Sequence, residues 1–198
     1  MYQFLETIKL RDGEFKRLAY HQIRLERAMS EFYPNVPVPL LNDILYRELF
    51  PLDGLYKCRV IYDSEIRKIE FKPYSLPIIR SLKIVETDMA SLPYKPADRS
   101  GFQALFAQRG NCDDVLLMKN GLLTDTSYCN IALFDGKYWN TPRVPLLTGV
   151  NRAQLLDEGR LIEKDIKVEE LVNFQYIALF NALIEFGDVQ FDISAICP

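Results

Sequence analysis

The sequence contains few of the residues that the most common nucleophilic and metal sites require. Its 198 residues include one histidine, His21, and four cysteines that form neither a CxxC pair nor a cluster with histidine. We therefore expect no metal site. A Ser–His or Cys–His nucleophile would have to use His21, which lies at an expected helix start beside Arg24, and we do not assign it that role. Dispersed thiols in a chain of this length are typical of a reducing cytoplasm.

Nucleotide and hydrolase signatures are also missing, because the sequence has no GxGxxG segment, no Walker-type loop and no GxSxG elbow. Lys and Arg total 24 against 27 Asp and Glu, so the net charge of −3 offers no general attraction to nucleic acids or anionic membranes. No apolar run is long enough to cross a bilayer, and charges at Glu6 and Lys9 exclude a signal-peptide core. We expect a cytoplasmic protein without nucleic-acid or membrane partners.

The composition that is present belongs to a globular protein of one domain or two small ones, with 48% hydrophobic and 26% charged residues. Asp12 and Gly13 form a turn pair between alternating segments, which predicts a hairpin near the N-terminus. Apolar residues at helical spacing predict a helix over 21–32. A second helix with Leu41, Ile44, Leu45 and Leu49 on one face, and strands at 55–62 and 66–72, follow it.

Residues 72–77 form the best linker candidate, because Pro73 and Pro77 disfavour both helix and central strand. The linker predicts a small N-terminal α+β domain, 1–78, and a larger C-terminal domain, 79–198. In the second part we expect strands at 81–86, 115–119, 130–134, 161–168 and 175–179, and helices over 97–109 and from 149 to 158. The predicted fold class is α+β, with two domains that share a cleft.

Seven short motifs follow one another along nearly the whole chain. Each is weak alone, but as an ordered set they resemble the class IV, or fold type IV, pyridoxal-phosphate enzymes, a family of branched-chain and D-amino-acid aminotransferases and aminodeoxychorismate lyases. The matching segments are Glu6-Thr-Ile with Asp12-Gly13, His21-x-x-Arg24-Leu25, Lys95-x-x-x-Arg99, Thr124-Asp-Thr-Ser-Tyr-x-Asn130, Trp139-x-Thr-Pro142, Leu147-x-Gly-Val-x-Arg152 and Asn181-Ala-Leu. The resemblance implies pyridoxal 5′-phosphate in the cleft between the domains.

The resemblance assigns the reactive amine to Lys95. The cofactor is an aldehyde that binds covalently to an amine, and lysine is the side chain that supplies one; once displaced, Lys95 can act as a general base. The cofactor also needs a carboxylate beside its ring nitrogen, and the matching position holds Asp125 where the family has Glu, one methylene longer. The alternatives are a solvated surface lysine and an acid that completes a strand end.

For the cofactor phosphate, the start of the helix after Gly149 provides backbone N–H groups at Val150 and Asn151, and the glycine allows close approach of the backbone. The resemblance adds Arg24 as the charged phosphate partner, although a solvent-facing helix position is the alternative. It also places Asn130 in the cofactor pocket, together with Asn181. Arg152 is expected to brace the loop.

For the substrate, we consider Arg59, because strands at this place line the cleft in the family and some members use an arginine there for an acidic group. An edge-strand arginine at the surface is an equal alternative. The Glu6 segment and the block that ends at Arg24 are most similar to the aminodeoxychorismate-lyase branch. That branch eliminates pyruvate from 4-amino-4-deoxychorismate and leaves 4-aminobenzoate for folate synthesis.

Two other functions are consistent with the same motifs. An aminotransferase that acts on branched-chain or D-amino acids would use the same Lys95, and shared motifs do not separate it from a lyase. A cofactor-binding relative without turnover would be consistent with Asp125 in place of Glu. The family is generally homodimeric, so we expect a homodimer that acts on a small molecule.

Overall fold

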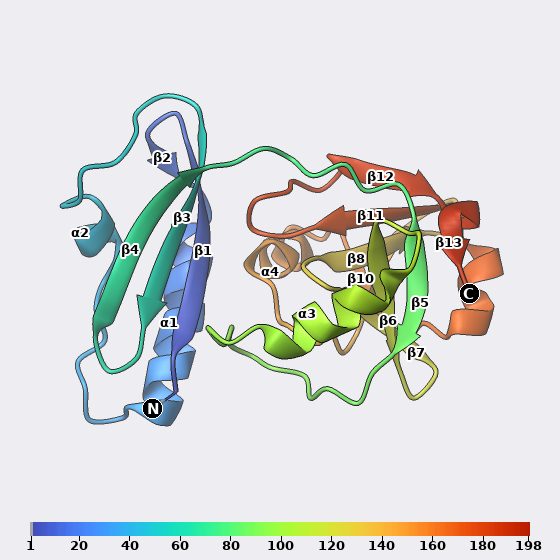
Figure 1. The fold of residues 1–198 in the computed structure, drawn as a ribbon, viewed down its shortest axis with the longest axis horizontal. Helices are drawn as coiled ribbons and strands as arrows, with labels where there is room; N and C mark the ends of the chain where they lie inside the picture. The colour runs from blue at the N-terminus through green and yellow to red at the C-terminus, as the bar shows by residue number, and fades with distance from the viewer. Residues whose placement is uncertain (1) are drawn as a thin grey trace. The chain divides into compact units, whose positions relative to one another are not determined.

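The structure is a computed structural model that describes residues 2–198. It divides into two compact units. The first consists of residues 2–76 and Pro93–Asp98, and the second of Pro77–Leu92 and Arg99–Pro198. Figure 1 shows the elements of each unit, and the helix and strand content agrees with the predicted α+β class.

The first unit is an antiparallel sheet covered on one face by a helix (Figure 1). Its elements are β1 (Phe4–Arg11), β2 (Glu14–Phe15), α1 (Leu18–Phe32), α2 (Leu41–Leu45), β3 (Leu55–Tyr62) and β4 (Ile66–Pro73). The strand order is β2-β1-β3-β4. The predicted hairpin is confirmed, because β1 pairs with β2 through a turn in which Asp12 and Gly13 both have positive φ, at 49° and 78°.

Strand β1 is unusual because every residue from Phe4 to Leu10 is buried. One of its faces packs Phe4 and Ile8 against Leu25 and Met29 of α1 in a single hydrophobic core. Residues that alternate with these, such as Thr7, lie on the other face of the sheet. The polar members of β1 are therefore buried by the fold and must find partners within it.

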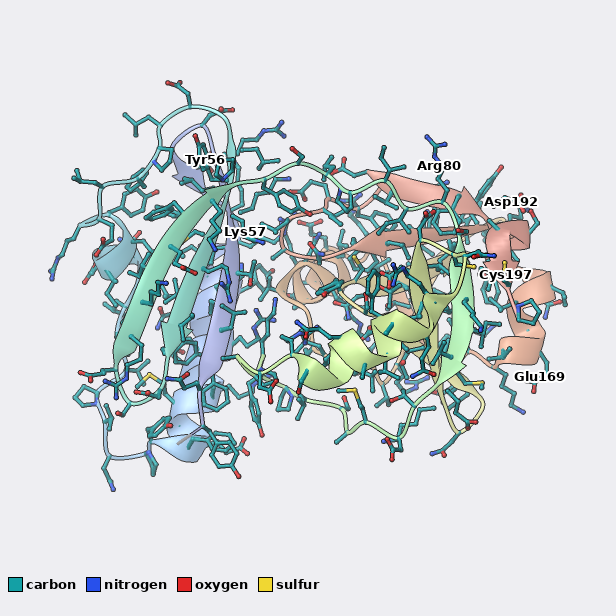
Figure 2. The ribbon with its side chains drawn as sticks, viewed as in Figure 1. Tyr56, Lys57, Arg80, Glu169, Asp192 and Cys197 are labelled. Atoms are coloured by element: carbon teal, nitrogen blue, oxygen red, sulfur yellow. The ribbon has the colours of Figure 1, made fainter. Side chains whose placement is uncertain are left out.

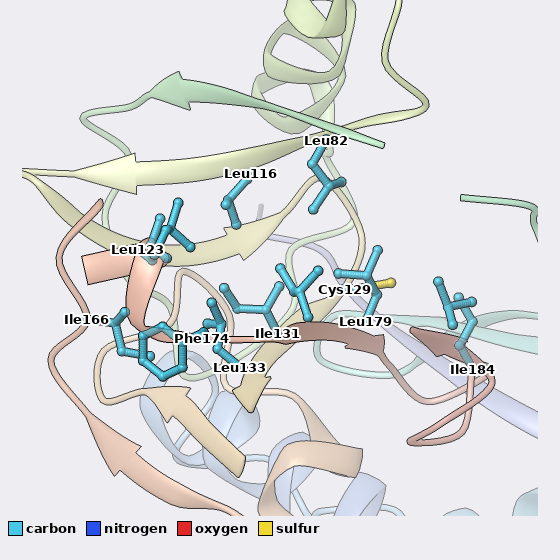
Figure 3. Close-up of a cluster of buried hydrophobic side chains, with 13 residues drawn as sticks. Leu82, Leu116, Leu123, Cys129, Ile131, Leu133, Ile166, Phe174, Leu179 and Ile184 are labelled. Atoms are coloured by element: carbon cyan, nitrogen blue, oxygen red, sulfur yellow. The ribbon is translucent and has the colours of Figure 1, made fainter. Parts of the chain in front are cut away.

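The second unit is built on a larger mixed sheet. Its elements are β5 (Leu82–Glu86), α3 (Ser100–Phe106), β6 (Asp114–Lys119), β7 (Leu122–Thr126), β8 (Asn130–Phe134), β9 (Trp139–Pro142), α4 (Val150–Asp157), β10 (Ile162–Lys164), β11 (Tyr176–Phe180), β12 (Val189–Asp192), β13 (Ile196–Cys197) and three 3-10 turns, Ala107–Arg109, Val168–Asn173 and Ile193–Ala195. The main strand order is β10-β9-β8-β7-β6-β5-β13, and β11 pairs with β8 and β12. Figure 3 shows the core that this sheet carries, in which Leu116, Leu123, Ile131 and Leu179 are almost fully buried.

Three predicted elements differ from the structure. The second helix ends at Leu45, and Leu49, expected on its apolar face, is 99% exposed; the chain must become extended before Pro51. Within the predicted strand 161–168, only Ile162–Lys164 form a strand, β10, which pairs with β9. Ile166 does not continue this pairing; its carbonyl accepts a hydrogen bond from the Leu123 amide of β7 instead. The helix expected over 97–109 starts at Ser100 and tightens to a 3-10 turn at its end.

Candidate cofactor site

Lys95 lies on a segment that is added to the open edge of β1. The amide of Leu5 donates to the carbonyl of Lys95 at 2.9 Å, and the amide of Ala97 donates to the carbonyl of Gln3 at 2.8 Å. The ammonium Nζ of Lys95 donates to Thr7 Oγ1 at 3.1 Å. The predicted reactive lysine is thus a half-buried side chain whose backbone is fixed to the sheet and whose amine lies on the face opposite α1.

On that same face, three lysines form a cross-strand row. Lys9 of β1 is directly opposite Lys57 of β3, which is directly opposite Lys72 of β4. Figure 2 marks Lys57 on its strand. Like charges directly opposite each other destabilise a sheet. Glu70 lies 4.0 Å from Lys72 and offsets part of this repulsion.

The next row on this face contains Thr7, Arg59 and Glu70, again directly opposite one another. Arg59 donates to Glu70 at 3.0 Å, and Lys68 forms an ion pair with the same carboxylate at 2.6 Å. The one acidic residue of the two rows is therefore shared between cations. We call the set Lys9, Lys57, Arg59, Lys68 and Lys72 the cationic face; Lys95 reaches it through Thr7.

Arg24 lies on the other face of β1, between the sheet and α1. Its Nε and Nη2 donate to the two oxygens of Glu6 at 2.9 and 2.6 Å, and all three groups of the Glu6, His21 and Arg24 cluster are buried. Nδ1 of His21 lies 2.5 Å from Glu6 Oε2. Burial alone would raise the pKa of Glu6, but the Arg24 charge and the His21 hydrogen bond outweigh it and lower the pKa to about 2.

Two buried polar atoms beside this cluster have no hydrogen-bond partner among residues 2–198, namely His21 Nε2 and the hydroxyl of Tyr62. The charge of Arg24 acts on the phenol of Tyr62, so the two groups lie near each other. The Nδ1–H of neutral His21 donates to Glu6, so its Nε2 is an acceptor, and of the two atoms only the Tyr62 hydroxyl can donate to an anionic oxygen. That Arg24 binds the cofactor phosphate stays a prediction: its guanidinium is paired with Glu6 on the face of β1 opposite to the one that carries the Lys95 amine.

In the second unit, Asp125 and Asn130 are a directly opposed pair that closes the β7–β8 hairpin. Asn130 Nδ2 donates to Asp125 Oδ1 at 2.8 Å, and the amide of Leu147 donates to Asp125 Oδ2 at 2.9 Å. Burial raises the pKa of Asp125 to about 6, because these neutral donors only partly offset the loss of water. The predicted ring-nitrogen partner is therefore a buried carboxylate held by two neutral donors, the Asn130 side chain and the Leu147 amide.

Helix α4 begins at Val150, next to this carboxylate, and its N-cap residue Gly149 gives no side-chain cap. Both Val150 and Asn151 are buried, but the Asn151 side chain donates to the carbonyls of Asn181 and Ile184 at 2.8 and 3.1 Å. Only the backbone N–H groups at this helix start therefore fit the predicted role toward a phosphate.

Three side chains in the segment 124–129 form hydrogen bonds within the second unit. Thr124 donates to the carbonyl of Leu117 at 3.0 Å, and Ser127 donates to Asp114 at 2.5 Å. The Cys129 sulfur accepts from Asn181 at 3.3 Å, and burial raises its pKa to about 12. Each of the three has a partner that fixes the local backbone.

The structure thus groups the predicted site residues into two sets. Lys95 and Arg59 share the cationic face and Arg24 lies across β1, whereas Asp125, Asn130, Gly149 and the start of α4 belong to the second unit. Sequence reasoning gave no role to Glu6, although its alternation with Phe4 and Ile8 places it on the buried face of a strand. The contact of Leu147 with Asp125 could not be predicted from residue type, because it is made by the backbone amide.

Two further features of the described residues concern metal ions and membranes. Residues 2–198 contain no group of three or more His, Cys, Asp or Glu side chains placed to hold a metal ion. No helix among them has the length and apolar character to span a bilayer. The available chemistry is a lysine amine, a buried carboxylate, helix-start amides and a buried guanidinium with the Tyr62 hydroxyl near it. These groups fit pyridoxal 5′-phosphate, which has an aldehyde, a basic ring nitrogen and a phosphate.

Comparison with known proteins supports the same cofactor. The family described as amino-transferase class IV matches residues 99–190. A Haemophilus influenzae protein of uncharacterised function is 38% identical over 185 residues, which is 92% of this chain and 98% of that protein. The crystal structure of a Haemophilus somnus protein, named as a proposed 4-amino-4-deoxychorismate lyase, is 30% identical, covers 93% of this chain and 98% of its own, and has a TM-score of 0.87.

A third comparison concerns the fold alone. A proposed amino-acid aminotransferase from Mesorhizobium loti is 21% identical, with a TM-score of 0.80 over 97% of this chain and 99% of its own. The α+β fold class predicted from the sequence is therefore confirmed by its likeness to solved structures.

Proposed function

Because this chain belongs to the class IV aminotransferase family, whose enzymes depend on pyridoxal phosphate, we propose that it is a lyase that converts 4-amino-4-deoxychorismate to 4-aminobenzoate and pyruvate. The alternative within the family is an aminotransferase. Both use the same lysine, so the substrate-binding residues must distinguish them.

The observation that carries the proposal is the cationic face. The substrate has two carboxylates in addition to its amine, and the lysine row with Arg59 concentrates positive charge around Thr7, where the Lys95 amine is bound. The whole chain has a net charge of −3, so this concentration is local. A dianionic substrate presents two carboxylates to this concentration of positive charge, whereas a branched-chain amino acid supplies one carboxylate only.

In this proposal each predicted residue has a defined task. Lys95 binds the cofactor aldehyde and, once displaced by the substrate amine, removes the proton from the carbon that carries that amine. Asp125 holds the proton on the cofactor ring nitrogen. When bound, the cofactor supplies a ring that takes up the electron pair left on that carbon.

Elimination then breaks the bond between the ring carbon and the enolpyruvyl oxygen, and the electron pair leaves with that oxygen. The enolpyruvyl group gains a proton and becomes pyruvate, while the six-membered ring becomes aromatic. Arg24 and the amides of Val150 and Asn151 hold the phosphate, and Arg59 binds a substrate carboxylate. Asn130 and Gly149 keep the acid and the helix start in place.

Product analysis tests the proposal. Protein loaded with cofactor is incubated with 4-amino-4-deoxychorismate and, separately, with D-alanine or a branched-chain amino acid plus an oxo acid. We expect 4-aminobenzoate and pyruvate in equal amounts from the first mixture only. Transamination in the second mixture without 4-aminobenzoate in the first assigns the chain to the aminotransferases instead.

A variant pair tests the cationic face. Arg59→Gln removes one carboxylate partner and should raise KM for the dianionic substrate by about tenfold to a hundredfold, with a smaller change in kcat. Arg67→Gln is the matched control, because Arg67 on the next strand pairs with Asp63 at 2.7 Å and with Glu65. An equal KM change in both variants contradicts the role of Arg59.

A further inference from the structure

The β7–β8 hairpin and the turn before α4 are joined through both polar groups of one residue, Leu147. Its amide donates to Asp125 Oδ2 at 2.9 Å, and its carbonyl accepts from Asn130 Nδ2 at 2.9 Å. The same Asn130 Nδ2 donates to Asp125 Oδ1 at 2.8 Å. Both protons of the Asn130 amide are therefore used, and two acceptors fix its orientation.

Gly149 completes this arrangement. A Cβ atom at Gly149 would lie 1.9 Å from Asn130 Oδ1 and 3.1 Å from Asn130 Cγ. The backbone of Gly149 has φ −76° and ψ 144°, which any residue can adopt. The glycine is therefore explained by the close approach of the Asn130 side chain and not by its own backbone conformation.

We propose that Asn130 is a positioning residue, which holds the Asp125 carboxylate in a fixed place relative to the start of α4 and requires glycine at 149 to do so. Through Asn130, the group assigned to the cofactor ring and the amides assigned to its phosphate become one rigid unit. This inference rests on the proposed role of Asp125 at the ring nitrogen.

The other side of the turn supports the same unit. The amide of Leu92 donates to the carbonyl of Leu146 at 2.8 Å, and the amide of Thr148 donates to the carbonyl of Leu92 at 3.2 Å. Residues 146–148 are thus held from both sides, by Asp125 and Asn130 on one and by Leu92 on the other. Lys95 follows Leu92 by three residues along the chain.

Asn130 also stabilises the ionised form of Asp125. The described charged and titratable groups that act on this carboxylate are Arg152 of α4 and the buried thiol of Cys129. Arg152 itself is tied to Glu163 at 2.7 Å. The hydrogen bond from Asn130 is the largest influence that favours the ionised form of Asp125.

The chain contains a matched control for Asn130. Asn140 is equally buried, and its Nδ2 also donates to one carboxylate and one carbonyl, those of Asp135 at 2.9 Å and Tyr138 at 3.2 Å. Asn130→Ala and Asn140→Ala therefore remove the same chemical contacts at two places, only one of which involves Asp125.

The first measurement uses the protein without cofactor. The carboxyl carbon of Asp125, identified by its loss in Asp125→Asn, is followed by NMR as the pH is changed. We expect Asn130→Ala to raise the pKa of Asp125 above its value in the unmodified protein, and Asn140→Ala to leave it unchanged. This readout is independent of the reaction catalysed, so its failure is distinct from failure of the proposed function.

The second measurement is the dissociation constant for pyridoxal 5′-phosphate. Asn130→Ala should weaken binding by about tenfold or more, because it removes a hydrogen bond to a buried charged group. Gly149→Ala should weaken it similarly, whereas in an Asn130→Ala background the same change should have little further effect. If Asn130→Ala does not fold, Gly149→Ala alone tests the claim. An unchanged Asp125 titration and cofactor affinity in these variants would overturn it.

Discussion

At the scale of single residues, the two carboxylates Glu6 and Asp125 are both fully buried but have opposite electrostatic surroundings. Glu6 is held by the guanidinium of Arg24, and its pKa falls to about 2. Asp125 is held by neutral donors, and its pKa rises to about 6. Glu6 is thus suited to fix a cation permanently, whereas Asp125 is suited to accept a proton-bearing ligand near neutral pH.

This difference predicts how stability depends on pH. The pKa of Glu6 is about 4.5 unfolded and about 2 folded, so its stabilising contribution is complete above pH 4.5 and is lost as the pH falls toward 2. We expect Glu6→Gln to lower the free energy of unfolding by about 3 kcal/mol at pH 7, measured by urea titration. The difference between the two proteins should shrink steadily below pH 4.5.

Glu70→Gln provides the comparison. Glu70 also pairs with an arginine, but on the sheet face, where both partners are partly exposed, so solvent screens the interaction. We expect a smaller loss of stability and a weaker dependence on pH than for Glu6→Gln, because Lys68 and the neighbouring cations also lower the pKa of Glu70 but act through solvent. A Glu6→Gln protein as stable as Glu70→Gln would show that the buried ion pair does not contribute as described.

At the scale of elements, turns determine where the functional side chains lie. The β6–β7 turn contains Asn120 and Gly121, both with positive φ, at 52° and 77°. This geometry fits the right-handed twist of a two-residue hairpin. Because β7 carries Asp125, the turn sets the position of the acid along the sheet.

Gly121→Ala tests the importance of that turn. An added Cβ meets nothing within 4 Å, so any loss comes from the backbone conformation alone, at about 1–2 kcal/mol. Gly101→Ala is the control, since Gly101 lies in α3 with only ordinary contacts to Met89 at 3.5 Å, and alanine there should stabilise slightly. Thermal unfolding of both variants measures the difference; equal destabilisation would contradict it.

Local signals predicted most elements of this fold. The Asp12–Gly13 turn and the strand at 55–62 are predicted correctly because turn residues and alternation act over a few residues. The break in 161–168 was missed because Ile166 leaves one strand for another that is distant in sequence. The same limit applies to the site: motif order indicated Asp125 and Asn130, but the Leu147 amide that joins them depends on tertiary contact.

At the scale of the whole molecule, residues assigned to one cofactor come from both compact units. Lys95 and Arg24 belong to the first unit, and Asp125 with the start of α4 belongs to the second. The chain passes between the units at 76–77 and again on both sides of Pro93–Asp98. A ligand that binds only the folded chain should stabilise it.

Cofactor binding should therefore raise the stability of the chain. A ligand that binds only the folded state at one hundred times its dissociation constant adds about 2.7 kcal/mol. We expect excess pyridoxal 5′-phosphate to shift the urea midpoint accordingly, and Asp125→Ala to reduce the shift at the same concentration. Pyridoxal, which lacks the phosphate, is the control and should produce a smaller shift. Equal shifts with both compounds would contradict the phosphate site.

The central claim is that Lys95 is the residue that binds the cofactor covalently. Reduction of the cofactor-loaded protein with borohydride, followed by peptide mass analysis, tests it most directly. We expect a single stable adduct on the peptide that contains Lys95, and no adduct on Lys95→Ala treated in the same way. An adduct on another lysine, or its persistence in Lys95→Ala, would show that Lys95 is not the residue that binds the cofactor.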